Sequence, residues 1–362
     1  MEISLDDYLN SPRFSRRERA AVLWAEHVAK NTARERDDVF EEVHKHFNDA
    51  ELVELTGVCG QFASSNRFQD SLRLPIEEHG EVSKIKGSLH ADSNLIKASL
   101  ERLIEYWPNE FPEASKGISD VALSMTARSS LAATSSRAAN GTAWAARVPM
   151  LDPNMAKGES ARFFEASQLL FGGVSNAVRM WAHIPYVAKL IMPFQSVMEH
   201  DGAGNMLPIT LKMMVLVRTG YLNSAAYSVA HRSAAGRLAG LTEDQLAALA
   251  TDDCADSCHF SRRERAAVLW AEHVASNTAK RRDDVFDRLT PHFNDQEIVE
   301  LTGVCAMGNQ MDRIYNALRL PLESDREIEA LHRTTWLDPG RLKTYVETLI
   351  AHWPKEFPVP TD

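Results

Sequence analysis

The chain has 362 residues, of which 44% are hydrophobic and 25% are charged, the balance of a globular protein with a sizeable core. Its net charge of −10 argues against a general nucleic-acid binder, which needs a basic surface to displace counterions from phosphates. Short apolar runs, an acidic N-terminal sequence and four cysteines in total argue against a membrane span, a signal peptide and a disulfide scaffold, so we expect a cytoplasmic protein without membrane partners.

The first predicted element, Phe14–Ala29, recurs letter for letter at Phe260–Ala275. The offset of 246 residues (260 − 14) continues without a gap, and residues 14–77 match residues 260–323 at 42 of 64 positions. This identity excludes chance, so a duplicated segment stands at both ends of the chain, with unrelated sequence between them. We predict a duplicated half-domain over residues 1–116.

Helical patterns run through nearly the whole chain. In residues 17–28 the apolar side chains recur with the 3.6-residue period of an α-helix, and charged side chains occupy the other face. Asn48 precedes an acidic first turn, and Thr242 is followed three residues later by Gln245, as is typical of helix N-caps. No run of β-branched and aromatic residues alternates between hairpin turns, so we predict an all-α protein.

The sequence between the repeats has two parts. Residues 117–146 are rich in Ala and Ser, which favours an interdomain linker, although a longer helix with a small-residue packing face has the same composition. From residue 147 the density of apolar residues is that of a folded domain. We therefore predict a full domain over residues 147–362, with a helical extension at its end.

The copies diverge most in one window, where residues 60–71 and 306–317 share a single arginine. Either the second window faces a functional pocket, or both windows lie on a surface and have diverged without functional consequence.

The cysteines do not form a recognisable metal site. Cys254 and Cys258, followed by His259, lack the usual Cys-x-x-Cys spacing of structural zinc and a second pair of ligands, so we expect free thiols and no bound metal. Cys59 and Cys305 occupy equivalent places in the repeated sequence TGVC and are predicted to be buried.

Three segments from the middle of the chain carry a resemblance to a known family: RVPMLDP at 147, FFEASQLLFGGVSNAVRMWAHIPYVAKLIMPF at 163 and LPITLKMMVLVRTGYLNSAAYSVAHRSAAGRL at 207. Together they resemble the first half of a domain of the alkylhydroperoxidase-D-like and carboxymuconolactone decarboxylase superfamily, and the C-terminal copy of the repeat resembles the second half. The resemblance covers residues 147–323. It implies an alkylhydroperoxidase-D-like helical bundle that self-associates as a homo-oligomer.

The peroxidase branch of this family carries Cys-x-x-Cys-x-x-His, with a Glu twelve residues before the first Cys. The matching positions here hold Ala225, Ser228 and His231, and Met213 stands at the position of the Glu. A disulfide cannot form between Ala225 and Ser228, so no thiol peroxidase chemistry is expected on this helix. The pattern is nearer to the decarboxylase branch, which works without the cysteine pair.

The resemblance and the helical spacing together predict a site around His231. Imidazole titrates near neutrality, and on a helix His231 shares a face with Ser224 and Ser228, while Tyr227 precedes it by four residues. We predict His231, Ser228 and Tyr227 as catalytic residues, and Arg218, Tyr221 and Asn223 as substrate-binding residues. His183 and His200 are expected to have surface or capping roles.

The resemblance implies a lyase or decarboxylase-type enzyme without a cofactor. It would act on a small organic acid, a lactone or a related intermediate, with His231 moving a proton. Two alternatives remain open from the sequence: a hydrolase or isomerase that uses the same histidine, and a non-catalytic family member that serves in binding or assembly.

Overall fold

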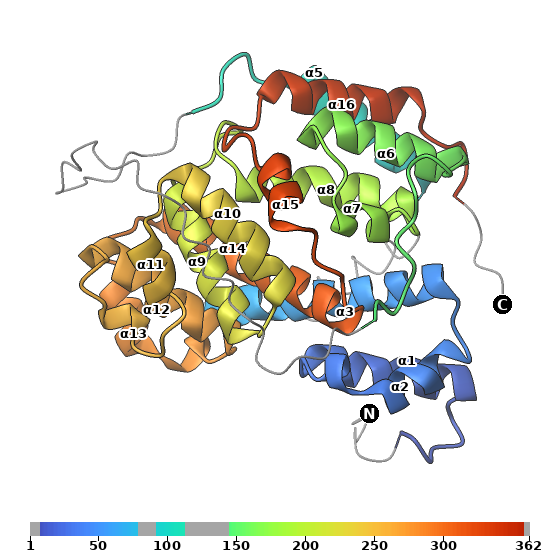
Figure 1. The fold of residues 1–362 in the computed structure, drawn as a ribbon, viewed down its shortest axis with the longest axis horizontal. Coiled ribbons are helices and arrows are strands. Elements are labelled where there is room, and N and C mark those ends of the chain that lie inside the picture. Colours follow the sequence, from blue (N-terminus) through green and yellow to red (C-terminus); the bar gives the residue numbers. More distant parts are fainter. Residues whose placement is uncertain (1–7, 79–91, 113–144, 358–362) are drawn as a thin grey trace.

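The structure, a computed structural model, describes residues 8–78, 92–112 and 145–357 (Figure 1). The helices before residue 145 are α1 (Arg16–Ala29), η2 (Ala33–Glu35), α2 (Asp37–His44), α3 (Asp49–Ser71) and α5 (Ser93–Glu105). Those after it are α6 (Gly158–Phe171), α7 (Asn176–Trp181), α8 (Pro185–Glu199), α9 (Ile209–Leu222), α10 (Ala226–Ala239), α11 (Glu243–Ala248), η4 (Cys254–Asp256), α12 (Arg262–Ala275), η5 (Ala279–Arg281), α13 (Asp283–Leu289), α14 (Asp295–Ala317), α15 (Asp325–Leu331) and α16 (Pro339–Ala351).

The predicted all-α class is confirmed. Within the described ranges the sole strand-like pairing is an isolated bridge between Asp201 and Trp336. None of the helices in these ranges is long and apolar enough to cross a membrane. The predicted linker at residues 117–146 lies almost entirely outside the described residues, and the domain boundaries on either side of it stay predictions.

Reciprocal capping boxes fix where several helices begin. Asn48 accepts a hydrogen bond from the backbone of Glu51, whose carboxylate accepts one from the backbone of Asn48 in return. Thr242 and Gln245 form the same box at α11, as the sequence predicted. These side chains satisfy N–H groups that the first turn of a helix leaves without partners, so the helix starts are set locally.

The two copies of the repeated sequence form the same helices. The bounds of α1, α3 and α5 become those of α12, α14 and α16 when 246 is added to each residue number. The same internal contact recurs as well: Trp24 Nε1 donates to Thr56 Oγ1 at 2.9 Å, and Trp270 Nε1 donates to Thr302 Oγ1 at 3.0 Å. The repeated sequence therefore has one local structure in two places.

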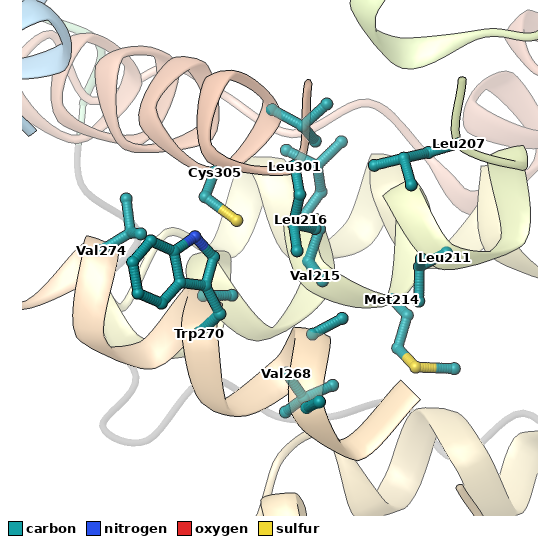
Figure 2. Packing of buried hydrophobic residues seen from close by; sticks show 14 of the residues in the cluster. Leu207, Leu211, Met214, Val215, Leu216, Val268, Trp270, Val274, Leu301 and Cys305 are labelled. Atoms are coloured by element: carbon teal, nitrogen blue, oxygen red, sulfur yellow. The ribbon is translucent and has the colours of Figure 1, made fainter. Parts of the chain in front are cut away.

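The hydrophobic core is divided into three clusters, and none is confined to the N-terminal copy. One joins α9 to α12, α13 and α14; Figure 2 shows Leu216, Trp270 and Cys305 meeting there. A second packs α1, α2 and α3 against α6, α7, α8 and the end of α14. The third joins α6 and α16, with α5 at its edge. The apolar side of the N-terminal copy is thus covered by helices from the middle of the chain.

Candidate functional site

A cavity of about 180 Å³ opens among α6, α8, α10 and the segment that follows α15. Helices α10 and α15 lie side by side near the centre of the molecule (Figure 1). Tyr227, Ser228 and His231 line the cavity from α10, and His332 lines it from the segment after α15. Apolar side chains such as Met192 and Ile209 cover much of the remaining wall. Its volume lies below the usual range for drug-sized ligands, so it suits only a small organic molecule.

A tight turn between α9 and α10 aims these side chains. Ser224 has φ of 52°, in the left-handed region, and α10 begins two residues later. Gly220 lets the helices approach closely, because a Cβ there would lie 2.9 Å from Val229. Tyr227 and His231 then follow one turn apart and stack, with ring centroids 4.4 Å apart. Ser224 precedes α10 and is exposed. It does not share a face with His231, contrary to the prediction.

The imidazole of His231 is held from both sides. Its Nε2 lies 2.9 Å from Glu323 Oε2, and its Nδ1 lies 3.0 Å from His332 Nε2. The three side chains therefore form a hydrogen-bonded chain, Glu323–His231–His332. In such an arrangement the carboxylate orients the first imidazole and stabilises its charged form, and the second imidazole extends the path of the proton.

Glu323 is held in its ionised form. Its Oε1 accepts hydrogen bonds from the Tyr227 hydroxyl at 3.1 Å and from the backbone N–H of Asn176 at 2.5 Å. Burial alone would raise the pKa of Glu323, but the hydrogen bonds from His231 and Asn176 outweigh it and keep that pKa below its usual value. Burial and the neighbouring Glu323 carboxylate raise the pKa of Tyr227 well above its ordinary value, so its hydroxyl keeps its proton.

His332 forms the end of this chain. Burial and the adjacent His231 lower the pKa of His332 to about 4, so its imidazole is neutral near pH 7. Among the described residues His332 Nδ1 makes no hydrogen bond, and the ring lines the cavity. Since both nitrogens of His231 are engaged, His332 is the group best placed to exchange a proton with a bound molecule.

Ser228 adds a polar contact to the cavity wall. The residue is only 2% exposed, and its Oγ has no hydrogen-bond partner among the described residues. A buried hydroxyl without a partner costs free energy, which a ligand in the cavity would relieve. Gln195 Oε1, on α8, lines the same cavity and is also buried without a partner.

The three residues predicted to bind substrate do not line this cavity. The guanidinium of Arg218 binds Glu272 at 2.8 Å and the carbonyl oxygens of Leu249 and Thr251, so it holds the core together. Asn223 Nδ2 is buried against Asn309 and Asp312. Tyr221 lies at the surface, 37% exposed. Helix α9 contributes Ile209 and Met213 to the cavity lining instead, while Arg218 and Asn223 are bound to partners on other helices.

None of the four cysteines lines the cavity next to Ala225 and Ser228, the positions at which the peroxidase branch carries its thiols. Cys254 Sγ donates to Glu272 at 3.2 Å, and burial raises the pKa of this thiol to about 12. Cys258 is exposed, Cys305 is buried and Cys59 is half-buried. In the described ranges no three Cys, His, Asp or Glu side chains cluster as metal ligands would.

The other predicted histidines have defined places. His200 caps α8, with its Nδ1 2.9 Å from the carbonyl oxygen of Ser196, and it also lines the cavity. His183 Nε2 lies 2.8 Å from the carbonyl oxygen of Pro149, on the outside of the fold.

Two residues of the hydrogen-bonded chain were missed by the sequence analysis. Glu323 ends the sequence LRLPLE, which recurs as LRLPIE with Glu77 at the matching place, so the repeat held a signal that was not used. His332 lies in a stretch without any recognisable motif. The divergent window at residues 306–317 does face the site, since Tyr315 lines the cavity.

Comparison with known proteins yields relatives without an established function. No protein-family model matches the chain. It is 29% identical over 154 residues to the uncharacterized protein YnjA of Escherichia coli K12, covering 42% of this chain and 82% of that protein. It is 22% identical over 147 residues to the uncharacterized protein YdfG of Bacillus subtilis 168, covering 40% of this chain and 95% of that protein.

Among solved structures, the chain is similar to an uncharacterized peroxidase-related protein from Silicibacter sp. TM1040. The identity is 19%, the TM-score is 0.42, and the match covers 52% of this chain and 93% of the other.

Proposed function

We propose that the chain is an acid–base enzyme of the lyase or decarboxylase type, acting without a cofactor on a small organic acid, a lactone or a related intermediate. The observation that carries this proposal is the chain Glu323–His231–His332, which ends at a cavity beside the unpartnered hydroxyl of Ser228. The resemblance to the decarboxylase branch of the superfamily supports the substrate class.

In this proposal His332 Nδ1 takes a proton from the substrate or returns one to it. The proton on His332 Nε2 passes to His231 Nδ1, and the carboxylate of Glu323 stabilises the resulting imidazolium while remaining ionised itself. Tyr227 keeps Glu323 in place through the hydrogen bond to Oε1. Ser228 donates a hydrogen bond to a substrate oxygen. Tyr227 thus orients Glu323, Ser228 orients the substrate, and the two histidines move the proton.

A thiol peroxidase is not proposed, because Ala225 and Ser228 stand where the two cysteines would be needed. Purified protein should therefore show no peroxide turnover that depends on its thiols. Turnover that vanishes on alkylation of the four cysteines would contradict this and direct attention to the exposed Cys258.

Proton transfer can be tested before the substrate is known. The purified chain is incubated in D₂O with a panel of small keto acids and lactones, and deuterium incorporation next to the carbonyl group is followed by NMR. We expect His231→Asn to reduce incorporation by roughly 10²–10⁴-fold, the usual contribution of one acid–base group. The melting temperature should stay nearly unchanged.

The exposed His259 offers a matched control, since His259→Asn removes an imidazole far from the cavity lining. It should leave incorporation unchanged. If the wild-type chain exchanges no proton of any panel member, or His231→Asn exchanges as fast as wild type, the acid–base proposal is wrong and the non-catalytic alternative is favoured.

A further inference from the structure

The two copies of the repeat contact each other in a reciprocal way. Arg67 Nε, on α3, donates to the carbonyl oxygen of Ala275 at 3.1 Å, and Arg313 Nε, on α14, donates to the carbonyl oxygen of Ala29 at 3.3 Å. Each arginine differs from its counterpart by 246 in residue number, and so does each acceptor. One contact is therefore made twice, once in each direction.

The ends of α3 and α14 repeat the pattern. Arg73 Nε donates to the carbonyl oxygen of Lys280 at 3.0 Å, and Arg319 Nε donates to that of Arg34 at 2.9 Å. Reciprocal contacts of this kind define an isologous, two-fold interface between identical subunits. The N-terminal copy therefore packs against the C-terminal copy as one subunit packs against its twin in a two-fold dimer.

The symmetry ends where the N-terminal copy meets the turn before α10. Asn31 Nδ2 donates to the carbonyl oxygen of Asn223 at 2.8 Å, and an Arg34 guanidinium nitrogen donates to that of Ser224 at 3.1 Å. Asn316 also donates to the Asn223 oxygen, at 2.9 Å. Both acceptors belong to the turn that decides where α10 begins, and so where His231 stands.

The matching residues of the C-terminal copy make no such contact. Asn277 Oδ1 is buried without a partner in the described part of the chain, and Lys280 pairs with Asp70 at 2.5 Å. Position 34 also differs in type, since it is Arg in the first copy and Lys at 280. The guanidinium that reaches the turn is thus specific to the N-terminal copy.

The N-terminal copy braces the opposite wall of the site as well. Gly57 of α3 lies against Trp181 of α7, where an added Cβ would be in ordinary van der Waals contact with the indole ring at 3.4 Å. The other end of α7 supplies the N–H of Asn176 to Glu323 and the N–H of Ala177 to the Tyr227 hydroxyl. Both elements that hold the hydrogen-bonded chain therefore rest on residues 14–77.

We propose that residues 14–77 act as a built-in subunit that holds the active site in its working geometry, with Asn31 and Arg34 as positioning residues for α10. The inference rests on the acid–base function proposed above. Its physical reason is the short reach of the chain Glu323–His231–His332, where a displacement of α10 by a fraction of an ångström would break a 2.9 or 3.0 Å hydrogen bond.

The test compares two double variants of the full-length protein: Asn31→Gly with Arg34→Ala, and Asn277→Gly with Lys280→Ala. Asn31 and Asn277 have φ of 57° and 54°, so glycine removes each side chain without straining the left-handed backbone. Both variants lose contacts between the copies at equivalent positions. Only the first variant also loses the hydrogen bonds to the turn before α10.

The first readout is NMR of ¹³C-labelled histidine at several pH values, with the resonances assigned from His231→Asn and His332→Asn. We expect the signals of His231 and His332 to shift in the first double variant and to stay at their wild-type positions in the second. The second readout is the deuterium exchange assay, in which the first variant should lose roughly 10- to 100-fold in kcat with KM unchanged.

Unchanged imidazole signals in the first variant, or equal changes in both variants, would overturn the positioning role. The NMR readout does not depend on turnover. If the wild-type chain exchanges no substrate proton, the proposed function fails, while the imidazole signals still decide whether the N-terminal copy positions α10.

Discussion

The two copies of the repeat have the same helices and share buried positions such as Leu52 and Ile298, but the buried surface of the long helix extends to a different side in each copy. Val53 of α3 is fully buried, whereas its counterpart Val299 is 48% exposed. Five residues further on, on another side of the helix, the relation reverses: Val58 is 47% exposed and Val304 is fully buried. Nearly identical sequences therefore bury different sides of the long helix next to these shared positions, which shows that the neighbouring helices decide how far the buried surface extends.

The neighbours differ because the middle of the chain lies against the copies asymmetrically. Trp181 of α7 covers α3 at Gly57, and Leu216 of α9 covers α14 at Gly308. The N-terminal copy has Phe62 at the place of Gly308, and this side chain is 65% exposed. A phenylalanine there excludes a helix that packs as closely as α9 packs on α14, so the first copy cannot hold an α9-like partner in the same way.

The same asymmetry separates a functional carboxylate from a surface one. Glu323 binds His231 in the cavity, whereas Glu77, at the matching place in the first copy, is exposed. We expect Glu323→Gln to lower proton exchange by roughly 10²–10⁴-fold, because His231 loses the charge that stabilises its protonated form. Glu77→Gln should have no effect. If the deuterium assay shows an equal loss of proton exchange in both variants, the distinction between the two carboxylates is wrong.

The second prediction concerns His332, whose counterpart in the first copy is Lys86. The folded pKa of about 4 lies below the ordinary histidine value of 6.5, so between these values the unfolded chain binds a proton that the folded chain does not. Stability should therefore rise with pH across this window, by at most about 3 kcal/mol from this group. Below pH 4 both states are protonated and this contribution ends.

Urea unfolding of wild type and His332→Asn between pH 4 and pH 6.5 checks the effect. In the variant, the free energy of unfolding should rise less steeply with pH, because the contribution of this histidine is missing. Parallel profiles would show that the imidazole is not buried in the way described.

The third prediction tests directly that equivalent valines differ in burial between the two copies. Val304→Ala and Val53→Ala each empty a fully buried site and should lower the free energy of unfolding by about 2 kcal/mol. Val58→Ala and Val299→Ala should change it by less than about 0.5 kcal/mol, because water already reaches these side chains. Urea denaturation of the four variants checks this. A common effect at equivalent positions would mean that the two copies bury these valines to the same extent.

The smallest effect is expected at the reciprocal arginines. The Arg319 side chain is only 8% exposed and donates to the carbonyl oxygen of Arg34 as well as to Asp37, so Arg319→Ala should cost about 1 kcal/mol. Arg73 is exposed and its partner Asp283 is more exposed still, so Arg73→Ala should cost less than about 0.5 kcal/mol. Thermal unfolding compares the two. A larger loss for Arg73→Ala would contradict the burial described for this pair.

Part of the site was predictable because it depends on neighbours along one helix. Tyr227, Ser228 and His231 lie one turn apart on α10, and helical spacing alone brings them to one face. Arg218 and Asn223 could not be judged in that way. Their partners, Glu272 and Asp312, come from other helices, and these contacts use up the groups that might have bound a substrate.

The sequence by itself determined the all-α class, the helix starts and the repeat, because capping and periodicity act within a few residues and do not depend on distant parts of the chain. Tertiary structure alone decided which further side of the repeated long helix is buried in each copy and that Glu323 and His332 meet His231. These residues are about a hundred positions from His231, and a contact at that separation arises only when α10, α14 and the segment after α15 pack together around one cavity.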